Sequence, residues 1–184
     1  MAGALILVDE FTISSAVSSV IIGGGSSGSS SYNFAIDSTY NVYQLVQNNV
    51  TGVGDDTTLR FRFTVSGTPD SSSNYDKAVE KLRADTGFNQ SATANQDYGR
   101  LSGSGTGTST GEVTKNTYYL FNFADSSEYS FITGEEVMYS YSTTLFGSQG
   151  GAALTVAQAT DGIQFYMDSG NIASGEFKLY GLRK

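Results

Sequence analysis

Carboxylates are the side chains of this sequence that could carry out hydrolytic chemistry. The chain has neither histidine nor cysteine, so a Ser-His-Asp triad or a Cys-His dyad cannot form. Three acidic pairs, Asp9-Glu10, Asp55-Asp56 and Glu135-Glu136, stand at the ends of expected strands. Glycoside hydrolysis needs two carboxylates facing each other across roughly 5 to 9.5 Å, whereas consecutive residues of a strand point to opposite faces. We therefore interpret each pair as a solvated turn and predict that the protein has no catalytic residues and is not an enzyme.

Two loops have the composition of ligand sites but not the spacing. Gly54-Asp55-Asp56 offers oxygen ligands to calcium, yet no EF-hand or RTX spacing is present. The stretch GSGTGTSTG, residues 103–111, resembles a phosphate-binding loop but lacks the Gly-Lys-Ser/Thr ending, and no helix is expected after it. We predict no metal or cofactor site and interpret residues 103–111 as a mobile hairpin loop. Hydrolysis of glycans through paired carboxylates, with Asp161 or Glu135 taking part, is the less favoured alternative.

Tyrosines are the second candidate for a ligand site, because sugar rings stack on exposed aromatic faces. The chain has 12 Tyr and 11 Phe, and Tyr40, Tyr98, Tyr129 and Tyr166 are the candidates for outward-facing positions. In all-β proteins, however, tyrosine more often lines cross-strand pairs and subunit contacts. We therefore expect assembly contacts from these side chains and keep sugar stacking as the alternative.

The composition and the hydrophobic pattern predict an all-β protein. Only 15% of the 184 residues are charged, so the residues that fill exposed helix faces are scarce. Tyr, Phe, Val and Thr are typical of strands, and here they occur in alternating runs separated by Gly-rich turns. Without the spacing of βαβ units, this pattern indicates an antiparallel sandwich or barrel. Of these we predict an antiparallel β-sandwich of jelly-roll type.

Several runs alternate clearly enough to assign side chains to one face of a strand. In residues 59–66 we expect Leu59, Phe61, Phe63 and Val65 to point inward and Arg60, Arg62, Thr64 and Ser66 to face solvent. Near the end of the chain, Ile163, Phe165, Met167, Phe177 and Leu179 are expected to point inward. Two further runs group Tyr119, Phe121 and Phe123 on one face, and Val137, Tyr139 and Tyr141 on one face.

Three segments depart from this pattern. Ala4–Val8 is a short apolar run, for which we expect a fully buried strand. Residues 23–31, GGGSSGSSS, have the composition of a solvated loop, with a hinge as the alternative. Residues 75–84 show helical spacing and predict one short helix, with a solvated excursion as the alternative. We divide the chain into an N-terminal strand or arm with its Gly/Ser-rich loop (1–31) and a β-sandwich (32–184), which together form one continuous domain.

The charge of the chain bears on its partners. The net charge is −8, so we expect phosphate backbones and anionic lipid head groups to be repelled and predict neither nucleic-acid nor membrane binding. The absence of cysteine excludes disulfides and fits folding in a reducing cytosol. The start of the chain lacks a basic region, so we expect no secretory signal.

The closing stretch, DGIQFYMDSGNIASGEFKLYGLRK (Asp161–Lys184), resembles the C-termini of a broad group of structural proteins of tailed bacteriophages. Those chains often end with a similar SGNIASG…LYGL pattern. Upstream, IDSTYNVYQLVQNNV followed by LRFRFTVSGTPDSSSNYDKA is similar to the same group, so the resemblance spans roughly residues 36–182.

The resemblance implies a non-enzymatic virion structural protein that is exposed on the particle and assembled in the host bacterial cytoplasm. We expect a capsid decoration or head projection rather than a tail protein. The expected partners are two further copies of the chain, forming a homotrimer, and other virion proteins such as the major capsid or tail protein. Residues 1–31 are the expected anchor. A carbohydrate-binding, receptor-recognition module of a tail fibre, with a host-surface glycan as partner, is the alternative.

Overall fold

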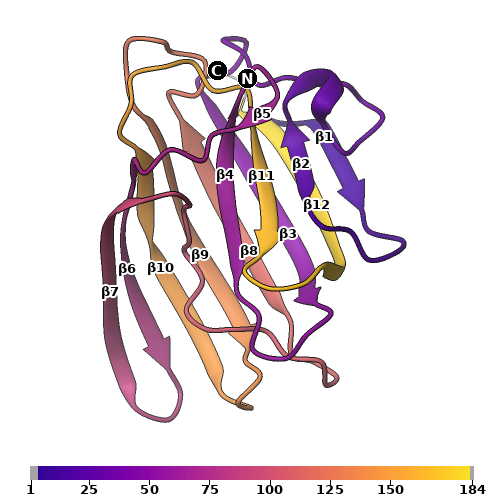
Figure 1. Ribbon diagram of the computed structural model, residues 1–184, viewed down its shortest axis with the longest axis vertical. Helices are drawn as coiled ribbons and strands as arrows, with labels where there is room; N and C mark the ends of the chain where they lie inside the picture. Colours follow the sequence, from indigo (N-terminus) through magenta and orange to yellow (C-terminus); the bar gives the residue numbers. More distant parts are fainter. Residues whose placement is uncertain (1–3, 183–184) are drawn as a thin grey trace.

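The computed structural model describes residues 4–182, and its regular secondary structure is antiparallel strand except for one short helical turn (Figure 1). The sheet elements are β1 (Leu5–Thr12), β2 (Val20–Gly23), β3 (Val42–Gly52), β4 (Leu59–Val65), β5 (Thr68–Pro69), β6 (Tyr75–Arg83), β7 (Gly87–Gln96), β8 (Thr114–Phe121), β9 (Ser130–Tyr139), β10 (Leu145–Leu154), β11 (Gly162–Met167) and β12 (Ile172–Leu182). Among the described residues, the one helical element is a single 3-10 turn, Gly25–Ser27, and no helix is long and apolar enough to cross a membrane.

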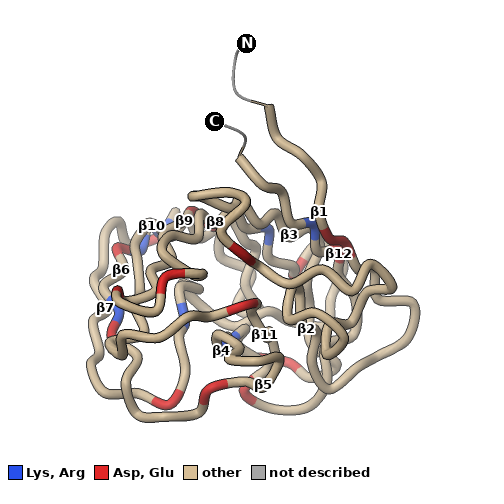
Figure 2. The backbone as a smooth tube through the Cα atoms, turned by 90° about the horizontal axis from the view of Figure 1, so that it is seen from above, with Lys and Arg blue, Asp and Glu red and all other residues tan. Residues whose placement is uncertain are grey.

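The strands form two sheets that pack face to face, so the predicted antiparallel β-sandwich is confirmed (Figure 2). The larger sheet has eight strands in the order β1-β12-β3-β8-β9-β10-β6-β7, and the smaller has four in the order β2-β11-β4-β5. Residues 1–31, expected to be an arm and a loop, give strand β1 to the larger sheet and strand β2 to the smaller one. The closing strands lie inside the sheets: β11 pairs with β2 and β4, and β12 pairs with β1 and β3.

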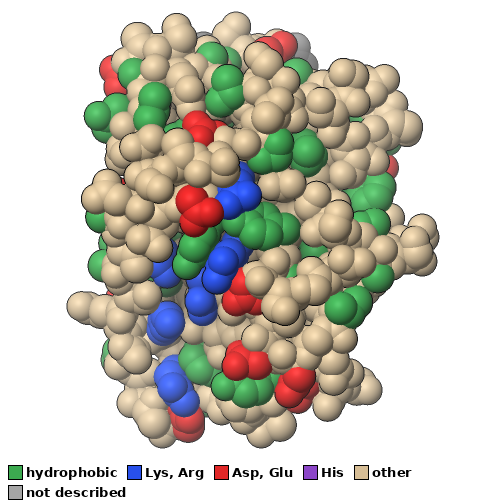
Figure 3. Space-filling model, in the orientation of Figure 1, with side chains coloured by type: hydrophobic (Ala, Val, Ile, Leu, Met, Phe, Trp, Pro, Cys, Tyr) green, Lys and Arg blue, Asp and Glu red, His purple; other side chains and the backbone are tan. Residues whose placement is uncertain are grey.

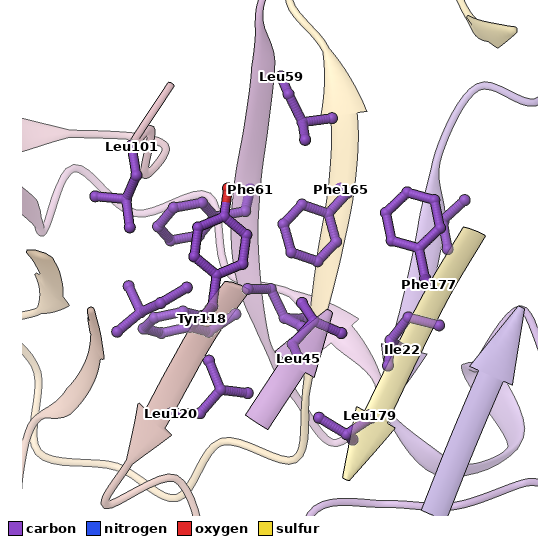
Figure 4. Close-up of a cluster of buried hydrophobic side chains, with 14 of the residues drawn as sticks. Ile22, Leu45, Leu59, Phe61, Leu101, Tyr118, Leu120, Phe165, Phe177 and Leu179 are labelled. Atoms are coloured by element: carbon purple, nitrogen blue, oxygen red, sulfur yellow. The ribbon is translucent and has the colours of Figure 1, made fainter. Parts of the chain in front are cut away.

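Aromatic side chains from both sheets fill the space between them (Figure 4). Phe165 of β11 lies 5.6 Å from Phe177 of β12 and is stacked with Tyr118 of β8 at 6.2 Å between ring centroids. The inward assignments are confirmed for Leu59, Phe61, Phe63 and all five residues of the closing strands, each of which is buried. Val65, at the end of β4, is only half-buried.

The helix expected over residues 75–84 is wrong, because Tyr75–Arg83 is strand β6. Tyr75 and Val79 are buried on the inner face, but the inward position between them is Lys77. Because that lysine interrupts the alternation, only a spacing of four remained visible, and that spacing is also helical. Leu82, which completed the helical pattern, points to the outer face and is exposed.

The strand expected at Ala4–Val8 exists as the first part of β1, but it is not fully buried. Leu5, Ile6 and Leu7 are all exposed, and burial begins at Val8 and Asp9. The reason is the position of the strand: β1 is the edge of the eight-stranded sheet, and its first residues pair with the end of β12.

Candidate functional site

The acidic pairs differ in burial, and two of their six residues, Asp9 and Glu136, are buried. Glu136 on β9 accepts hydrogen bonds from the backbone N–H of Gly103 at 2.6 Å, Thr114 Oγ1 at 2.8 Å and Ser148 Oγ at 2.9 Å. Glu135 points to the opposite face of the sheet and is exposed. Burial raises the pKa of Glu136, and the three hydrogen bonds act against that rise. The prediction of a solvated turn is therefore wrong for Glu136.

Asp9 is also buried, so the solvated-turn interpretation fails there too. Its carboxylate accepts hydrogen bonds from Ser30 Oγ and from the backbone N–H of Gly23 at 2.7 Å. Asp161 likewise accepts from the Gly67 N–H at 2.8 Å, so both carboxylates hold backbone in place rather than face an open site. Asp55-Asp56 do lie in an exposed turn, as predicted.

The loop interpreted as mobile, residues 103–111, is instead packed over the inner face of the larger sheet. Gly103, Gly105, Thr106 and Gly107 are buried. Thr106 exchanges backbone hydrogen bonds with Thr57 at 2.8 and 3.2 Å. This loop covers Glu136, because the four-stranded sheet is too narrow to cover the eight-stranded one. Among residues 4–182, no three His, Cys, Asp or Glu side chains converge on a metal position.

The four candidate tyrosines lie in different surroundings. The guanidinium of Arg60 lies 4.0 Å from the ring centroid of Tyr98, and that of Arg62 lies 5.1 Å from Tyr166. Each of these two rings therefore has one face covered by a cation. Tyr129 is exposed in the turn before β9. Tyr40, in contrast, lines a pocket.

The Tyr40 pocket has a volume of about 450 Å³ and lies between the start of β3 and the turn that joins β8 to β9. Tyr40 contacts Tyr43 edge to face at 5.5 Å between centroids. Apolar atoms of Leu120 and Phe123 and polar groups of Ser38, Asn41, Asn122, Asp125 and Ser126 complete the lining. Aromatic rings beside amides, hydroxyls and a carboxylate match the chemistry of a sugar ring, with its apolar faces and polar edge.

The outer face of the larger sheet carries exposed apolar side chains where a solvated face would be polar. They are contributed by neighbouring strands β8, β9 and β10: Tyr119, Phe131, Val137, Tyr139 and Leu145. Beside them, Phe121 and Phe131 border an open hollow of about 480 Å³ floored by the small residues Gly151 and Ala153. Thr133 and Glu135 of β9 lie between Phe131 and Val137, so these side chains form two groups on the face. Exposed apolar groups of this kind are typical of protein–protein interfaces.

A second apolar group lies where the β1–β12 pair extends past the body of the molecule. Figure 2 shows this two-stranded ribbon rising from the side of the eight-stranded sheet. It exposes Leu5, Ile6 and Leu7 of β1 and Leu182 of β12, and Leu5 is paired with Leu182. We call the outer face of β8–β10 together with this ribbon the assembly surface.

Comparison of the chain with models of protein families, with curated proteins and with solved structures gives no match. The surfaces of the sandwich therefore carry the functional inference, because a fold class alone does not specify a function.

Sequence reasoning found the aromatic rows of the assembly surface but not their exposure. Of the group Tyr119, Phe121 and Phe123, the first two share a face of β8, whereas Phe123 follows the strand and is buried. Of the group Val137, Tyr139 and Tyr141, the first two share a face of β9, and Tyr141 follows that strand. The inward residues of these strands include Asn116 and Glu136, which are polar. The signal that could have revealed the exposed face was the regular alternation of Tyr118 and Leu120 with Tyr119 and Phe121, which gives β8 two apolar faces.

Proposed function

We propose that the protein is a non-enzymatic structural protein of a tailed-bacteriophage virion, assembled in the host cytoplasm and displayed on the particle as a capsid decoration or head projection in preference to the tail. The phage-like pattern of Asp161–Lys184 supports this proposal. So does the position of that pattern in the fold, since β11 and β12 are interior strands of the two sheets. We infer that the sandwich is of jelly-roll type.

The assembly surface is the observation that carries the structural role. Val137 is 50% exposed near the end of β9, beside Tyr139 on the same face, and Leu5 is 49% exposed on the ribbon. Removing such side chains from water stabilises a complex by about 25 cal/mol for each Å² of apolar area. Few charged side chains interrupt the rows: Lys115 and Glu135 are the charged residues that β8 and β9 place on this face. We infer that two further copies of the chain cover it, giving a homotrimer.

The anchor to the particle is inferred from the free edge of β1. This strand is the last of the eight-stranded sheet, so the described residues pair it on one side only. An unpaired edge offers backbone donors and acceptors to an added strand. We infer that a strand of the major capsid or tail protein pairs there, in agreement with the anchoring role expected for residues 1–31.

The homotrimer is tested with two matched substitutions, Val137→Lys on the assembly surface and Val53→Lys in the turn after β3. The two valines are exposed to 50% and 49%, so both changes add a cation at equal exposure. By light scattering, we expect the wild-type and Val53→Lys proteins to have three times the chain mass of 19.5 kDa. We expect Val137→Lys to be monomeric with an unchanged circular-dichroism spectrum. A monomeric wild type, or equal behaviour of the two variants, would contradict the inferred interface.

The Tyr40 pocket favours a second function, recognition of a host-surface glycan by a tail-fibre module. Asn41 lines the pocket and is exposed, so Asn41→Ala removes a polar contact without disturbing the core. On an array of host glycans, we expect binding by the wild type and by Tyr129→Ala, and loss of binding by Asn41→Ala. Absence of glycan binding by the wild-type protein would dismiss this second function and leave the structural role untouched.

A further inference from the structure

Basic side chains gather on one face of this acidic protein. The sequence has ten Lys and Arg residues and a net charge of −8, yet a group of cations lies over β4 and β6 in Figure 3. Six of the ten belong to β4, to β6 and to the segment that follows β7. They are Arg60, Arg62, Lys77, Lys81, Arg83 and Arg100, and all are half-buried. We call this group the basic patch.

The fold brings the patch together from three segments. Lys77 and Lys81 are inner-face residues of β6, which lies at the end of the larger sheet that the smaller sheet does not cover. Gly99 exchanges backbone hydrogen bonds of 2.9 Å with Phe61 of β4. This pairing places Arg100 near Arg60, and the charge of Arg100 acts on both Lys77 and Lys81.

Among residues 4–182, three cations of the patch form ion pairs with carboxylates and three do not, although the charge of Glu136 acts on both Lys81 and Arg100. Arg60 pairs with Asp168 at 3.7 Å, Arg62 with Asp97 at 2.6 Å and Arg83 with Asp85 at 2.7 Å, which accounts for three of the cations. Within residues 4–182, no ion pair includes Lys77, Lys81 or Arg100.

The three remaining cations contact few acceptors. Lys77 Nζ reaches Ser91 Oγ at 3.4 Å, and Arg100 Nε donates to the carbonyl oxygen of Ser102 at 3.2 Å. The nearby carboxylate of Glu136 already accepts three hydrogen bonds.

These cations are held at an energetic cost. Burial, followed by repulsion from Arg100 and Lys81, lowers the pKa of Lys77 to about 8. Burial also lowers the pKa of Lys81, with Arg100 acting in the same direction. Groups that a fold retains at such a cost are concentrated at functional sites. An anion between them would relieve the repulsion.

Neutral polar side chains border the cations. The residues of β7 that lie opposite Lys77, Val79 and Lys81 are Thr93, Ser91 and Asn89. Residues directly opposite in an antiparallel pair share a face of the sheet, so hydroxyl and amide groups run alongside the ammonium groups. A sugar chain presents the matching groups, because its hydroxyls both donate and accept and its acidic substituents are spaced by uncharged atoms. A nucleic-acid strand has at most one free hydroxyl in each internal nucleotide and so offers fewer partners to this row of polar side chains.

We propose that Lys77, Lys81 and Arg100 form a binding site for the carboxylate or sulfate groups of an acidic polysaccharide. This site is separate from the Tyr40 pocket, and it does not depend on the location of the protein in a virion.

The test measures binding to three immobilised polymers: polygalacturonate, which carries carboxylates, dextran sulfate, which carries sulfates, and uncharged dextran. We expect the wild-type protein to bind at least one acidic polymer, more weakly as salt is added, and not to bind dextran. Binding to one acidic polymer and not to the other identifies the anionic group. Binding to neither overturns the proposal.

The residues are tested with the double variant Lys77→Gln/Lys81→Gln and with Lys115→Gln, which removes one cation from the exposed outer face. We expect the double variant to bind at least about tenfold more weakly, since charge-assisted hydrogen bonds are among the stronger polar contacts. We expect Lys115→Gln, which removes one exposed charge, to change the affinity by less than about twofold. Equal losses in both variants overturn the proposal.

Two further measurements keep the result interpretable. Lys81→Arg retains the charge and should retain binding, and loss of binding in this variant contradicts a site that recognises charge. Light scattering at low salt tests a different occupant, an acidic surface of a second copy. If the double variant abolishes an association between copies, that contact and not a polysaccharide occupies the patch.

Discussion

Replacement of Phe177 by alanine tests the packing between the two sheets. Phe177 is fully buried on β12, and its ring lies 5.6 Å from that of Phe165 on β11. Truncating a buried phenylalanine to alanine costs about 3–5 kcal/mol, because apolar area is lost and a cavity remains. A typical domain is stabilised by about 5–15 kcal/mol, so we expect Phe177→Ala to remove a large share of the free energy of unfolding.

The assay is urea denaturation followed by far-UV circular dichroism, since the chain has no tryptophan. It is carried out in the Val137→Lys background, because association would make the apparent stability depend on concentration. The control is Phe88→Ala on the edge strand β7, where the side chain is 77% exposed. We expect the control to change the free energy of unfolding by less than about 0.5 kcal/mol. A loss below about 1 kcal/mol for Phe177→Ala would refute the assignment of β12 to the core.

Two other predictions follow from the larger sheet. Deletion of residues 103–108 should lower the thermal midpoint, because it removes the Gly103 N–H that binds Glu136 and the Thr106 contact with Thr57; an unchanged midpoint would show that the loop is dispensable. Lys77→Met should raise the free energy of unfolding at pH 7, because the ammonium is destabilised by burial, Arg100 and Lys81. The folded-state pKa of Lys77, about 8, lies below the ordinary 10.5, so the unfolded chain holds the proton more tightly. The free energy of unfolding of the wild type should therefore fall short of that of Lys77→Met by a constant amount below pH 8. This deficit should shrink between pH 8 and 10.5 and vanish above that range. A pH-independent deficit in denaturation experiments would contradict this cause.

The sequence was most informative where each strand has one apolar and one polar face. In β4 and β11, Phe61, Phe63 and Phe165 alternate with Arg62 and Gln164, and the inward face was predicted from that alternation. Strands β8 and β9, in the middle of the larger sheet, lack this contrast. There the inner face holds polar residues under the packed loop, and the outer face holds the aromatic rows. Hydrophobicity alone therefore indicated the wrong element at β6 and left the exposed face of β8 and β9 unassigned.

The candidate sites depended on contacts between distant segments. The Tyr40 pocket needs the turn before β9 to lie against the start of β3. The basic patch needs Gly99 to pair with Phe61 of β4, which brings Arg100 near Lys77 of β6. No local spacing specifies either arrangement, so composition could suggest tyrosines for sugar binding but could not show which of them, Tyr40, lines a pocket.

The most direct test of the virion proposal is the copy number of the protein in purified particles, measured by quantitative mass spectrometry. The phage gene is deleted, and the wild-type, Val53→Lys or Val137→Lys protein is supplied during infection. We expect hundreds of copies of the wild-type and Val53→Lys proteins in each virion, as suits a capsid decoration, and few or none of Val137→Lys. A few to tens of copies would place the protein in the tail and correct the favoured location. Absence of the wild-type protein from intact particles would contradict the proposal that it is a virion structural protein.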